Sequence, residues 1–250
     1  MKWRLIIDEG DVYWDMAVDE AMLLLHEEGL TPNTLRIYVI KPSGVTFGYF
    51  QRIHDAINID YLDFMKIDYT RRITGGGAVY HDMNGEITYS IVADIDDISW
   101  NILESYRIIC QGIVYAIEEF GLKAQYKPIN DVLVNGKKIS GSAQARKKRS
   151  LLQHGTLMYN TDLDILAKTI RVPKEKMLAH GIKSIRERVT TLALELGYNP
   201  GYRRVINALI NGFKKALDIE LERQKLTPME IRYAKRLVGK YRSREWIYKR

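Results

Sequence analysis

The sequence has only one cysteine, Cys110, so no disulfide bond can form within the chain. It has no apolar run of about eighteen residues, the length that a transmembrane helix needs. The apolar run within residues 1–8 is too short for a signal peptide. We therefore expect a soluble protein of the cytoplasm that has no membrane partner.

Several catalytic signatures are also missing. The chain contains no H-E-x-x-H motif and no Cys/His pairing for zinc, and its five histidines are scattered. No G-x-S-x-G turn presents a catalytic serine. The two familiar phosphate loops, G-x-x-x-x-G-K-[ST] and a G-x-G-x-x-G after a strand, are missing as well. Zinc chemistry and serine hydrolysis are therefore not supported.

The composition is that of a globular protein. Hydrophobic residues make up 46% of the 250 residues, which is enough for a sizeable core, and we expect a single domain spanning residues 1–250. The formal net charge of +7 favours anionic partners such as nucleotides, nucleic acid or an acidic protein surface. Charge alone does not choose among these.

The most informative segment runs from Arg71 to Asp82 and reads RRITGGGAVYHD. Consecutive glycines have no Cβ atoms, so the backbone can adopt positive φ and approach a ligand closely. Exposed N–H groups in such a loop suit phosphate or carboxylate oxygens. The two preceding arginines are of the type that binds oxyanions. We interpret the segment as a basic anion site with a glycine floor, the alternative being a flexible hairpin tip.

Periodicity predicts an α+β protein. Helices are predicted at 11–28, 58–65, 102–120, 162–169, 201–217 and 228–241, and strands at 3–8, 35–40, 45–49, 68–72, 124–127, 132–134, 138–142 and 151–159. A hairpin is predicted to join residues 78–80 to 86–92. The helix at 228–241 is predicted to be capped by Thr227, with Pro228 at its first position and Glu230 at its third. In the first helix, Asp15, Asp19, Glu20 and Glu27 are predicted to mark the solvated face. Because strands and helices do not alternate regularly, we expect mixed, mostly antiparallel sheets flanked by helices.

A second basic segment runs from residue 130 to residue 144. Asn135-Gly136 is typical of a type I′ hairpin turn, and strand alternation predicts that Lys138, Ser140 and Ser142 share one face. A lysine held on a strand can stabilise a phosphate or a developing oxyanion, and Asp131 could ligate Mg²⁺. The alternatives are a solvated hairpin tip and an aspartate that caps a turn.

Two further features have a structural and a functional interpretation. The basic run at 146–149 is either a solvated loop or a lid over phosphate groups. Cys110 lies in the apolar stripe of the helix predicted at 102–120, where we expect a buried and unreactive thiol rather than a nucleophile.

Taken in order, these segments resemble the lipoate–protein ligase A family of the biotin/lipoate ligase superfamily. The matching segments are DMAVDE at 15–20, residues 71–82, ND at 130–131, GKKISGSA at 136–143, HGTL at 154–157, GIKSIRERV at 181–189 and KYRSREW at 240–246. The resemblance implies the catalytic domain of a biotin/lipoate protein ligase fold. The C-terminal accessory domain of some members is expected to be absent, and a separate small subunit could supply it.

The resemblance implies a two-step ligation. Mg²⁺ and ATP activate the substrate lipoate as lipoyl-AMP, and the lipoyl group passes to a lysine of an acceptor domain. E2 subunits of 2-oxoacid dehydrogenases and the glycine cleavage H protein are the implied acceptors, and no nucleic-acid partner is expected.

The resemblance also assigns residues. Lys138 is the implied catalytic residue and Asp131 the implied metal ligand. The residues implied to bind the nucleotide are Val79, Tyr80, Asn130, Asp131 and Lys138. The residues implied to bind lipoate are Arg72, Thr74, Gly75, Gly76, Gly77, Ala78, His81, Gly141, Ser142, His154, Gly155 and Thr156.

Three functions besides lipoate ligation remain open. The octanoyltransferases of the same superfamily move an octanoyl group from acyl carrier protein through a cysteine nucleophile. That cysteine would be expected shortly before the Lys138 hairpin, where this chain has Lys127-Pro128-Ile129-Asn130-Asp131, so the cysteine route is disfavoured. The second function is that of a biotin ligase, and the third is that of a non-catalytic module that binds nucleotide or nucleic acid.

Overall fold

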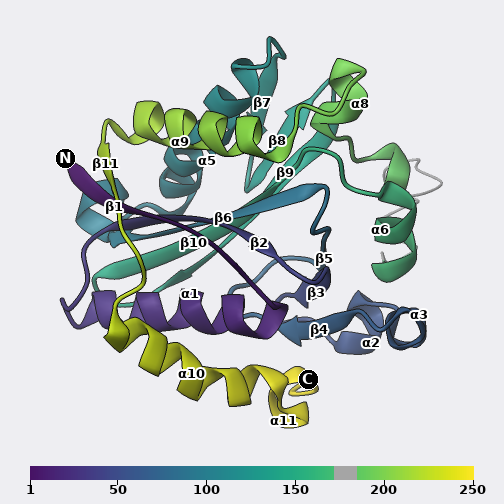
Figure 1. The fold of residues 1–250 in the computed structure, drawn as a ribbon, viewed down its shortest axis with the longest axis horizontal. Helices are drawn as coiled ribbons and strands as arrows, with labels where there is room; N and C mark the ends of the chain where they lie inside the picture. Colours follow the sequence, from purple (N-terminus) through teal and green to yellow (C-terminus); the bar gives the residue numbers. More distant parts are fainter. Residues whose placement is uncertain (172–184) are drawn as a thin grey trace.

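The computed structural model describes residues 1–171 and 185–250. In this part of the chain, eight strands form one mixed sheet with the order β11-β1-β2-β6-β10-β9-β8-β7, and β4-β3-β5 form a smaller sheet (Figure 1). The large sheet contains β1 (Lys2–Gly10), β2 (Thr34–Ile40), β6 (Glu86–Asp94), β7 (Ala124–Lys127), β8 (Asp131–Val134), β9 (Lys137–Arg146), β10 (Ser150–Met158) and β11 (Glu220–Arg223). The small sheet contains β3 (Gly44–Phe47), β4 (Asp68–Arg71) and β5 (Val79–His81).

Helices cover both faces of the large sheet (Figure 1). One face carries α5 (Ile102–Glu118) and α9 (Tyr202–Leu217), and the other carries α1 (Val12–Glu27) with α10 (Pro228–Arg242) outside it. The shorter helices are α2 (Ile53–Ala56), α3 (Ile59–Met65), α4 (Ile95–Ile98), α6 (Leu163–Thr169), the 3₁₀ helix η1 (Ile185–Glu187), α8 (Leu192–Leu196) and α11 (Arg244–Ile247). Among the described helices, none is long and apolar enough to cross a membrane. The expected α+β class with mixed, mostly antiparallel sheets is confirmed.

The main hydrophobic core lies between the large sheet and the pair α5 and α9. A Cβ atom at Gly112 of α5 would lie within 3 Å of the Phe213 ring, and one at Gly212 of α9 would lie 2.8 Å from Ala116 N. Glycine at these two positions therefore lets the two helices pack closely. Cys110 faces this core and is completely buried, as predicted.

The opposite face of the large sheet carries buried polar groups, which corrects the prediction for the first helix. Asp15 and Asp19 are 0% and 1% exposed rather than solvated. Both carboxyl groups bind the buried guanidinium of Arg36 on β2, with Asp19 at 3.2 Å. Glu20 is also not free in solvent, because Lys240 and Tyr241 of α10 donate to its carboxylate. The helix therefore has two buried faces, one of them charged.

The predicted hairpin between residues 78–80 and 86–92 is wrong. β5 pairs antiparallel with β3, whereas β6 pairs with β2 and β10 in the other sheet. The intervening turn carries the chain between the two sheets, and the Asp82 carboxylate accepts from the Asp162 N–H at 2.9 Å to hold it. Alternation of apolar residues predicted both strands but could not predict their partners.

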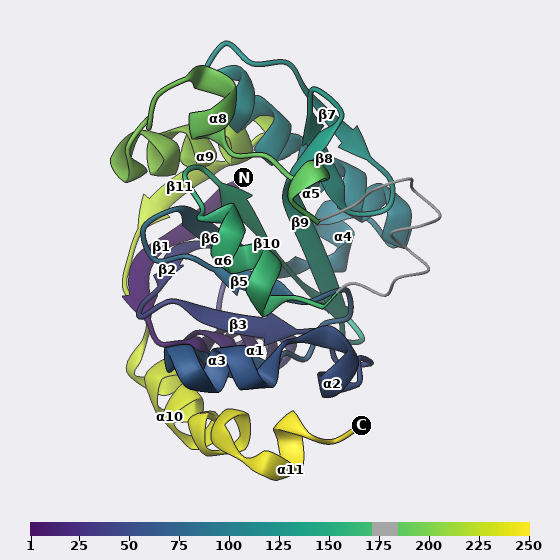
Figure 2. The same cartoon turned by 90° about the vertical axis from the view of Figure 1, so that its right-hand side faces the viewer.

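Two predicted local features are confirmed. Asn135 and Gly136 both have positive φ, at 49° and 77°, and join β8 to β9. Thr227 and Glu230 form the capping box of α10, with Pro228 in the first turn. Helix α6 contacts α3 and β5 (Figure 2).

Candidate functional site

A cavity of about 360 Å³ lies between the small and the large sheet. The glycine segment contributes Gly76 and Gly77 to its wall, and β9 and β10 contribute Lys138 and Gly155. Segments that are distant in sequence therefore enclose one space.

The glycine segment packs directly on another loop. Gly76 has φ +87°, a backbone conformation that side chains rarely adopt, and a Cβ atom at Gly48 would overlap its carbonyl oxygen. Arg72 donates to the carbonyl oxygens of Gly75 at 2.6 Å and of Gly77 at 2.7 Å. Burial lowers the pKa of Arg72 to about 10, so the guanidinium stays charged at neutral pH. A buried cation thus fixes the shape of the loop.

The neighbouring arginine has a different role from the predicted anion binding. Arg71 is completely buried and does not belong to the cavity wall. Its guanidinium donates to backbone carbonyls of Tyr49, Gln51 and Ile247 at 2.7, 2.7 and 2.9 Å. Arg71 therefore ties the loop after β3 to the C-terminal segment, and only Arg72 faces the cavity.

Lys138 lies in the cavity wall, where β9 deviates from regular alternation. A register shift between Val132 and Leu133 of β8 places Lys138 and Gly141 at the wall, while Ser140 is buried outside it. The predicted shared face of Lys138, Ser140 and Ser142 is therefore wrong at Ser140. A Cβ atom at Gly141 would lie 2.5 Å from Lys138 Nζ, so the missing side chain makes room for the amine.

Lys138 is held both at its side-chain amine and at its main chain. Its Nζ lies 2.6 Å from Asp131 Oδ1, in an ion pair whose lysine side chain is 38% exposed. The main chain of Lys138 bonds to Arg188 O at 2.8 Å and Thr190 N at 2.9 Å. A partly exposed ammonium on a fixed backbone can stabilise negative charge that develops on a bound ligand.

Asn130 and Asp131 belong to the same wall. Asn130 is fixed by two hydrogen bonds with the main chain of Ser142. Its side-chain amide donates to Ser142 O, and its main-chain carbonyl accepts from Ser142 N. In the described part of the chain, no three His, Cys, Asp or Glu side chains gather as a metal site would need. The predicted metal ligand Asp131 would therefore have to share a cation with oxygens of a ligand.

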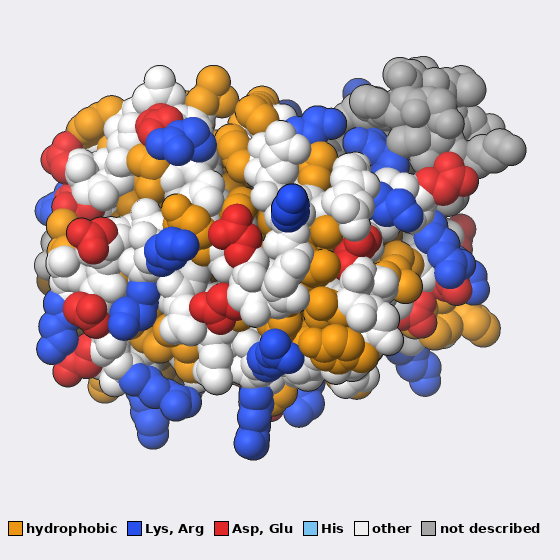
Figure 3. All heavy atoms as spheres, turned by 90° about the horizontal axis from the view of Figure 1, so that it is seen from above, with side chains coloured by type: hydrophobic (Ala, Val, Ile, Leu, Met, Phe, Trp, Pro, Cys, Tyr) orange, Lys and Arg blue, Asp and Glu red, His pale blue; other side chains and the backbone are white. Residues whose placement is uncertain are grey.

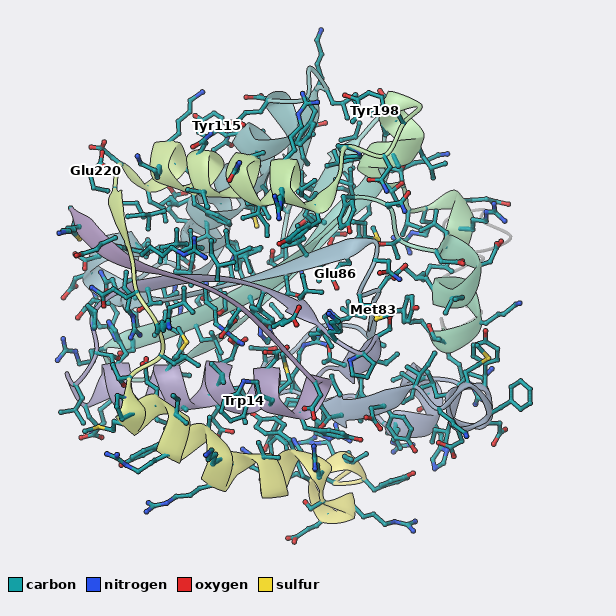
Figure 4. The ribbon with its side chains drawn as sticks, in the orientation of Figure 1. Trp14, Met83, Glu86, Tyr115, Tyr198 and Glu220 are labelled. Atoms are coloured by element: carbon teal, nitrogen blue, oxygen red, sulfur yellow. The ribbon has the colours of Figure 1, made fainter. Side chains whose placement is uncertain are left out.

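Two histidines contribute to the wall and are buried. His81 lies between Thr46 Oγ1 at 2.9 Å and Glu86 Oε2 at 2.7 Å. Figure 4 shows Glu86 at the start of β6, beside the turn that carries Met83. His154 contacts Asp19 and Thr74, and its ring thereby connects α1 to the glycine segment.

Cys110 cannot reach the cavity directly. It is 0% exposed, and Ser142 Oγ, which does belong to the wall, lies 3.6 Å from its sulfur. Burial raises the pKa of the thiol to about 11, so the thiolate fraction at neutral pH is very small. The only thiol of the chain is therefore not placed as a nucleophile.

The cavity gathers almost all predicted site residues. Those that line it are Arg72, Gly76, Gly77, Ala78, Val79, Tyr80, His81, Asn130, Asp131, Lys138, Gly141, Ser142, His154, Gly155 and Thr156. Thr74 and Gly75 are not among the residues that line the cavity. The part of the predicted segment 181–189 that covers residues 181–184 lies outside the described residues.

Sequence reasoning missed several lining residues. Met16, Tyr38, Arg171 and Arg188 also line the cavity. Met16 belongs to the apolar periodicity of α1, which gave no sign of a ligand site. Arg188 lies within the segment used for the family resemblance, and this was the one signal that could have found it.

The basic run at 146–149 is not a lid over the cavity, because none of its residues belongs to the cavity wall. Arg146 ends β9 and residues 147–149 form the tight turn to β10, where the Glu27 carboxylate accepts the N–H groups of Lys148 and Arg149. On the face formed by α9 and α8, basic and acidic side chains are interspersed (Figure 3). This face therefore does not form one continuous basic patch.

Comparison with known proteins gives consistent matches. Residues 11–214 match the family model of the lipoyl protein ligase A/B catalytic domain. Octanoyltransferase LipM of Brevibacillus brevis is 32% identical, with 100% of this chain and 99% of the relative covered.

Two solved structures are similar over nearly the whole chain. A bi-partite lipoate protein ligase from Thermoplasma acidophilum, described with its E2 lipoyl domain, is 33% identical with a TM-score of 0.86, covering 99% of this chain and 96% of that one. A lipoate–protein ligase A bound with ATP is 30% identical with a TM-score of 0.86, covering 99% of each.

Proposed function

The chain belongs to the lipoyl protein ligase A/B catalytic-domain family, and from this premise we propose that it attaches an octanoyl or lipoyl group to a lysine of a lipoyl domain. The observation that carries the proposal is the juxtaposition of the glycine segment and Lys138 in one cavity wall. The glycine backbone offers an acyl chain close approach, and the ammonium lies where charge on the reacting group could be neutralised.

The curated relatives favour octanoyl as the acyl group. The relatives that match the chain, that of Brevibacillus brevis among them, are named octanoyltransferases, which supports octanoyl transfer better than the lipoate ligation expected from the sequence. Lipoate ligation remains the second candidate because the similar structures are lipoate ligases and one of them binds ATP. The two acyl groups share the same carbon backbone, so one cavity can serve both.

Transfer proceeds without an acyl-enzyme thioester. Such an intermediate needs a thiolate that the donor can reach, and Cys110 is buried with its pKa raised to about 11. The acceptor lysine, as the free amine, instead attacks the carbonyl carbon of the bound acyl donor. The tetrahedral intermediate then expels the donor's leaving group and loses the amine proton, which leaves an amide. Lys138 Nζ stabilises the negative charge that forms on the carbonyl oxygen.

Two donors fit this step. An octanoyl thioester is the donor expected for the octanoyltransferase alternative. An acyl-adenylate is the donor expected for the ligase, and the cavity supports it with four cationic side chains in its wall, Arg72, Lys138, Arg171 and Arg188. For the ligase, Asp131 would share Mg²⁺ with the nucleotide phosphates, which fits a site that offers one carboxylate. The bound ion would neutralise phosphate charge.

One assay separates the candidates. The purified chain is incubated with a lipoyl domain and either octanoyl–acyl carrier protein, octanoate with Mg²⁺·ATP, or lipoate with Mg²⁺·ATP, and the mass of the domain is followed. Acylation from the thioester alone supports octanoyl transfer, and acylation that requires ATP, with pyrophosphate release, supports ligation. Each arm is repeated with a candidate small partner subunit, because a similar ligase is bi-partite. No acylation in any arm would refute the proposed function.

A further inference from the structure

A chain of buried hydrogen bonds runs beneath the glycine segment. His154 Nδ1 lies 2.9 Å from Asp19 Oδ2, and His154 Nε2 lies 2.7 Å from Thr74 Oγ1. Thr74 Oγ1 in turn lies 3.0 Å from Arg72 Nε. All four side chains are at least nine-tenths buried, and they come from α1, β10 and the loop after β4.

The donors and acceptors along this series of hydrogen bonds can be assigned. Desolvation lowers the pKa of His154, so its ring is neutral at neutral pH. Although burial opposes its ionisation, the hydrogen bond from His154 and the Arg36 charge hold the pKa of Asp19 below the ordinary value. His154 therefore donates from Nδ1 to the Asp19 carboxylate and accepts at Nε2. The Thr74 hydroxyl must donate to Nε2, which leaves its oxygen to accept from Arg72 Nε–H.

The last member of this series, Arg72, binds the backbone of the glycine segment. With Nε bound to Thr74, the Arg72 guanidinium is oriented so that Nη2 reaches the carbonyls of Gly75 and Gly77. No carboxylate contacts Arg72 among residues 1–171 and 185–250, so acid pairing does not set its orientation. Hydroxyl and carbonyl oxygens orient the Arg72 guanidinium instead. Among them, the Thr74 hydroxyl is the one that Asp19 and His154 hold in place.

We propose that Thr74 is a positioning residue that, fixed by Asp19 and His154, acts through Arg72 to hold the glycine segment in the shape that receives the acyl donor. The identity of the ligand rests on the proposed function, whereas the effect on the loop does not. An acyl-threonine intermediate is not part of the proposal, because Thr74 is buried and does not line the cavity.

The test compares three variants. Thr74→Val keeps the shape of the side chain and removes the hydroxyl, and Thr74→Ser keeps the hydroxyl. Ser90→Ala is the matched control, because Ser90 Oγ donates to Asp19 Oδ1 at 2.9 Å without belonging to the chain that reaches the loop. It removes a buried hydrogen bond from the same carboxylate, so it reports the general cost of such a loss.

The readouts are hydrogen exchange of a peptide covering residues 72–80 without ligand, and the KM and kcat of acyl transfer. For Thr74→Val we expect about tenfold faster exchange in this peptide and about tenfold higher KM for the acyl donor, since an unmade buried hydrogen bond is of that order. The kcat and the exchange of β6 and β10 should stay close to wild type. Thr74→Ser and Ser90→Ala should both keep wild-type loop exchange and KM.

Two results would overturn the proposal. One is wild-type loop exchange in Thr74→Val, and the other is an equal acceleration in Ser90→Ala, which would make the effect one of general destabilisation. If the wild-type chain acylates no acceptor, the proposed function fails, but the exchange experiment still decides whether Thr74 positions the loop.

Discussion

Substitution of Gly48 by alanine tests whether the shape of the glycine segment matters for transfer. A Cβ atom at this position would overlap the Gly76 carbonyl oxygen and lie 3.0 Å from the carbonyl carbons of Gly75 and Gly76. These are backbone atoms, so no side chain can rotate away to relieve the contact. The carbonyl oxygen has to retreat by about 1 Å to reach ordinary van der Waals distance.

The structure gives the size of the effect. Overpacking of this kind costs about 1–3 kcal/mol, and in a protein of this length each 1 kcal/mol lowers the melting temperature by roughly 2–4 °C. Displacement of a ligand-binding group by about 1 Å can reduce a rate about 100-fold. We therefore expect Gly48→Ala to lose about two orders of magnitude in acyl transfer while it still folds.

Calorimetry and the acceptor-mass assay measure these two effects, and Gly239→Ala is the control. Gly239 is an exposed position inside α10 where an added Cβ meets nothing within 4 Å. This substitution should stabilise the chain by about 0.5–1 kcal/mol, because glycine is a poor helix former, and should leave transfer unchanged. Wild-type transfer by Gly48→Ala would refute the argument that the loop shape determines activity.

Three further perturbations test the site and the buried charges. Lys138→Ala should reduce the rate of acyl transfer about 100- to 1,000-fold. The melting temperature should change little, because the ion pair that the substitution breaks is partly exposed. Turnover equal to that of the wild type would remove Lys138 from the mechanism. Cys110→Ala should keep the wild-type rate of acyl transfer. The thiol of the native protein should resist iodoacetamide at pH 8, because burial raises its pKa to about 11. Loss of transfer in a folded Cys110→Ala variant would contradict transfer without an acyl-enzyme thioester. Burial raises the pKa of Asp15 to about 8, so the native state holds a proton that the unfolded chain releases above about 4. The resulting contribution to the free energy of unfolding is fully present below about pH 4 and is lost as the pH rises to about 8. When the free energy of unfolding in urea is plotted against pH, Asp15→Asn should therefore flatten the curve over this range. An unchanged slope would show that Asp15 is ionised in the native state.

Local signals predicted the local structure well. The Asn135-Gly136 turn and the capping box of α10 depend on residues within a few positions of one another, so the sequence was enough to predict them. The burial of Asp15 and Asp19 depends on Arg36, which lies on another strand, and amphipathic periodicity treats every carboxylate as solvated. The partners of β5 and β6 are likewise set by contacts between distant segments.

The candidate site was predictable where chemistry is concentrated in short segments. The glycine segment, the Asn130-Asp131 pair and Lys138 all line the cavity. Ser140 was misplaced because the register shift in β8 and β9 changes which side chains share a face, and no residue type announces that shift. Met16 reaches the cavity from an apolar helix face, and its periodicity is the same as that of any core residue.

The two adjacent arginines show why a motif can be recognised from residue types while its roles cannot. Neighbouring residues of an extended chain point in opposite directions, so Arg71 and Arg72 leave the end of β4 on opposite sides. Arg71 donates to carbonyls of the loop after β3 and of the C-terminal segment, and Arg72 donates to carbonyls of the glycine segment. Both are buried cations satisfied by neutral oxygens, so the charge that suggested anion binding serves first to fix backbone. Gly48 belongs to the loop after β3 and packs against Gly75 and Gly76 of the glycine segment. The C-terminal segment, which Arg71 ties to this loop, therefore helps to set the shape of the cavity wall.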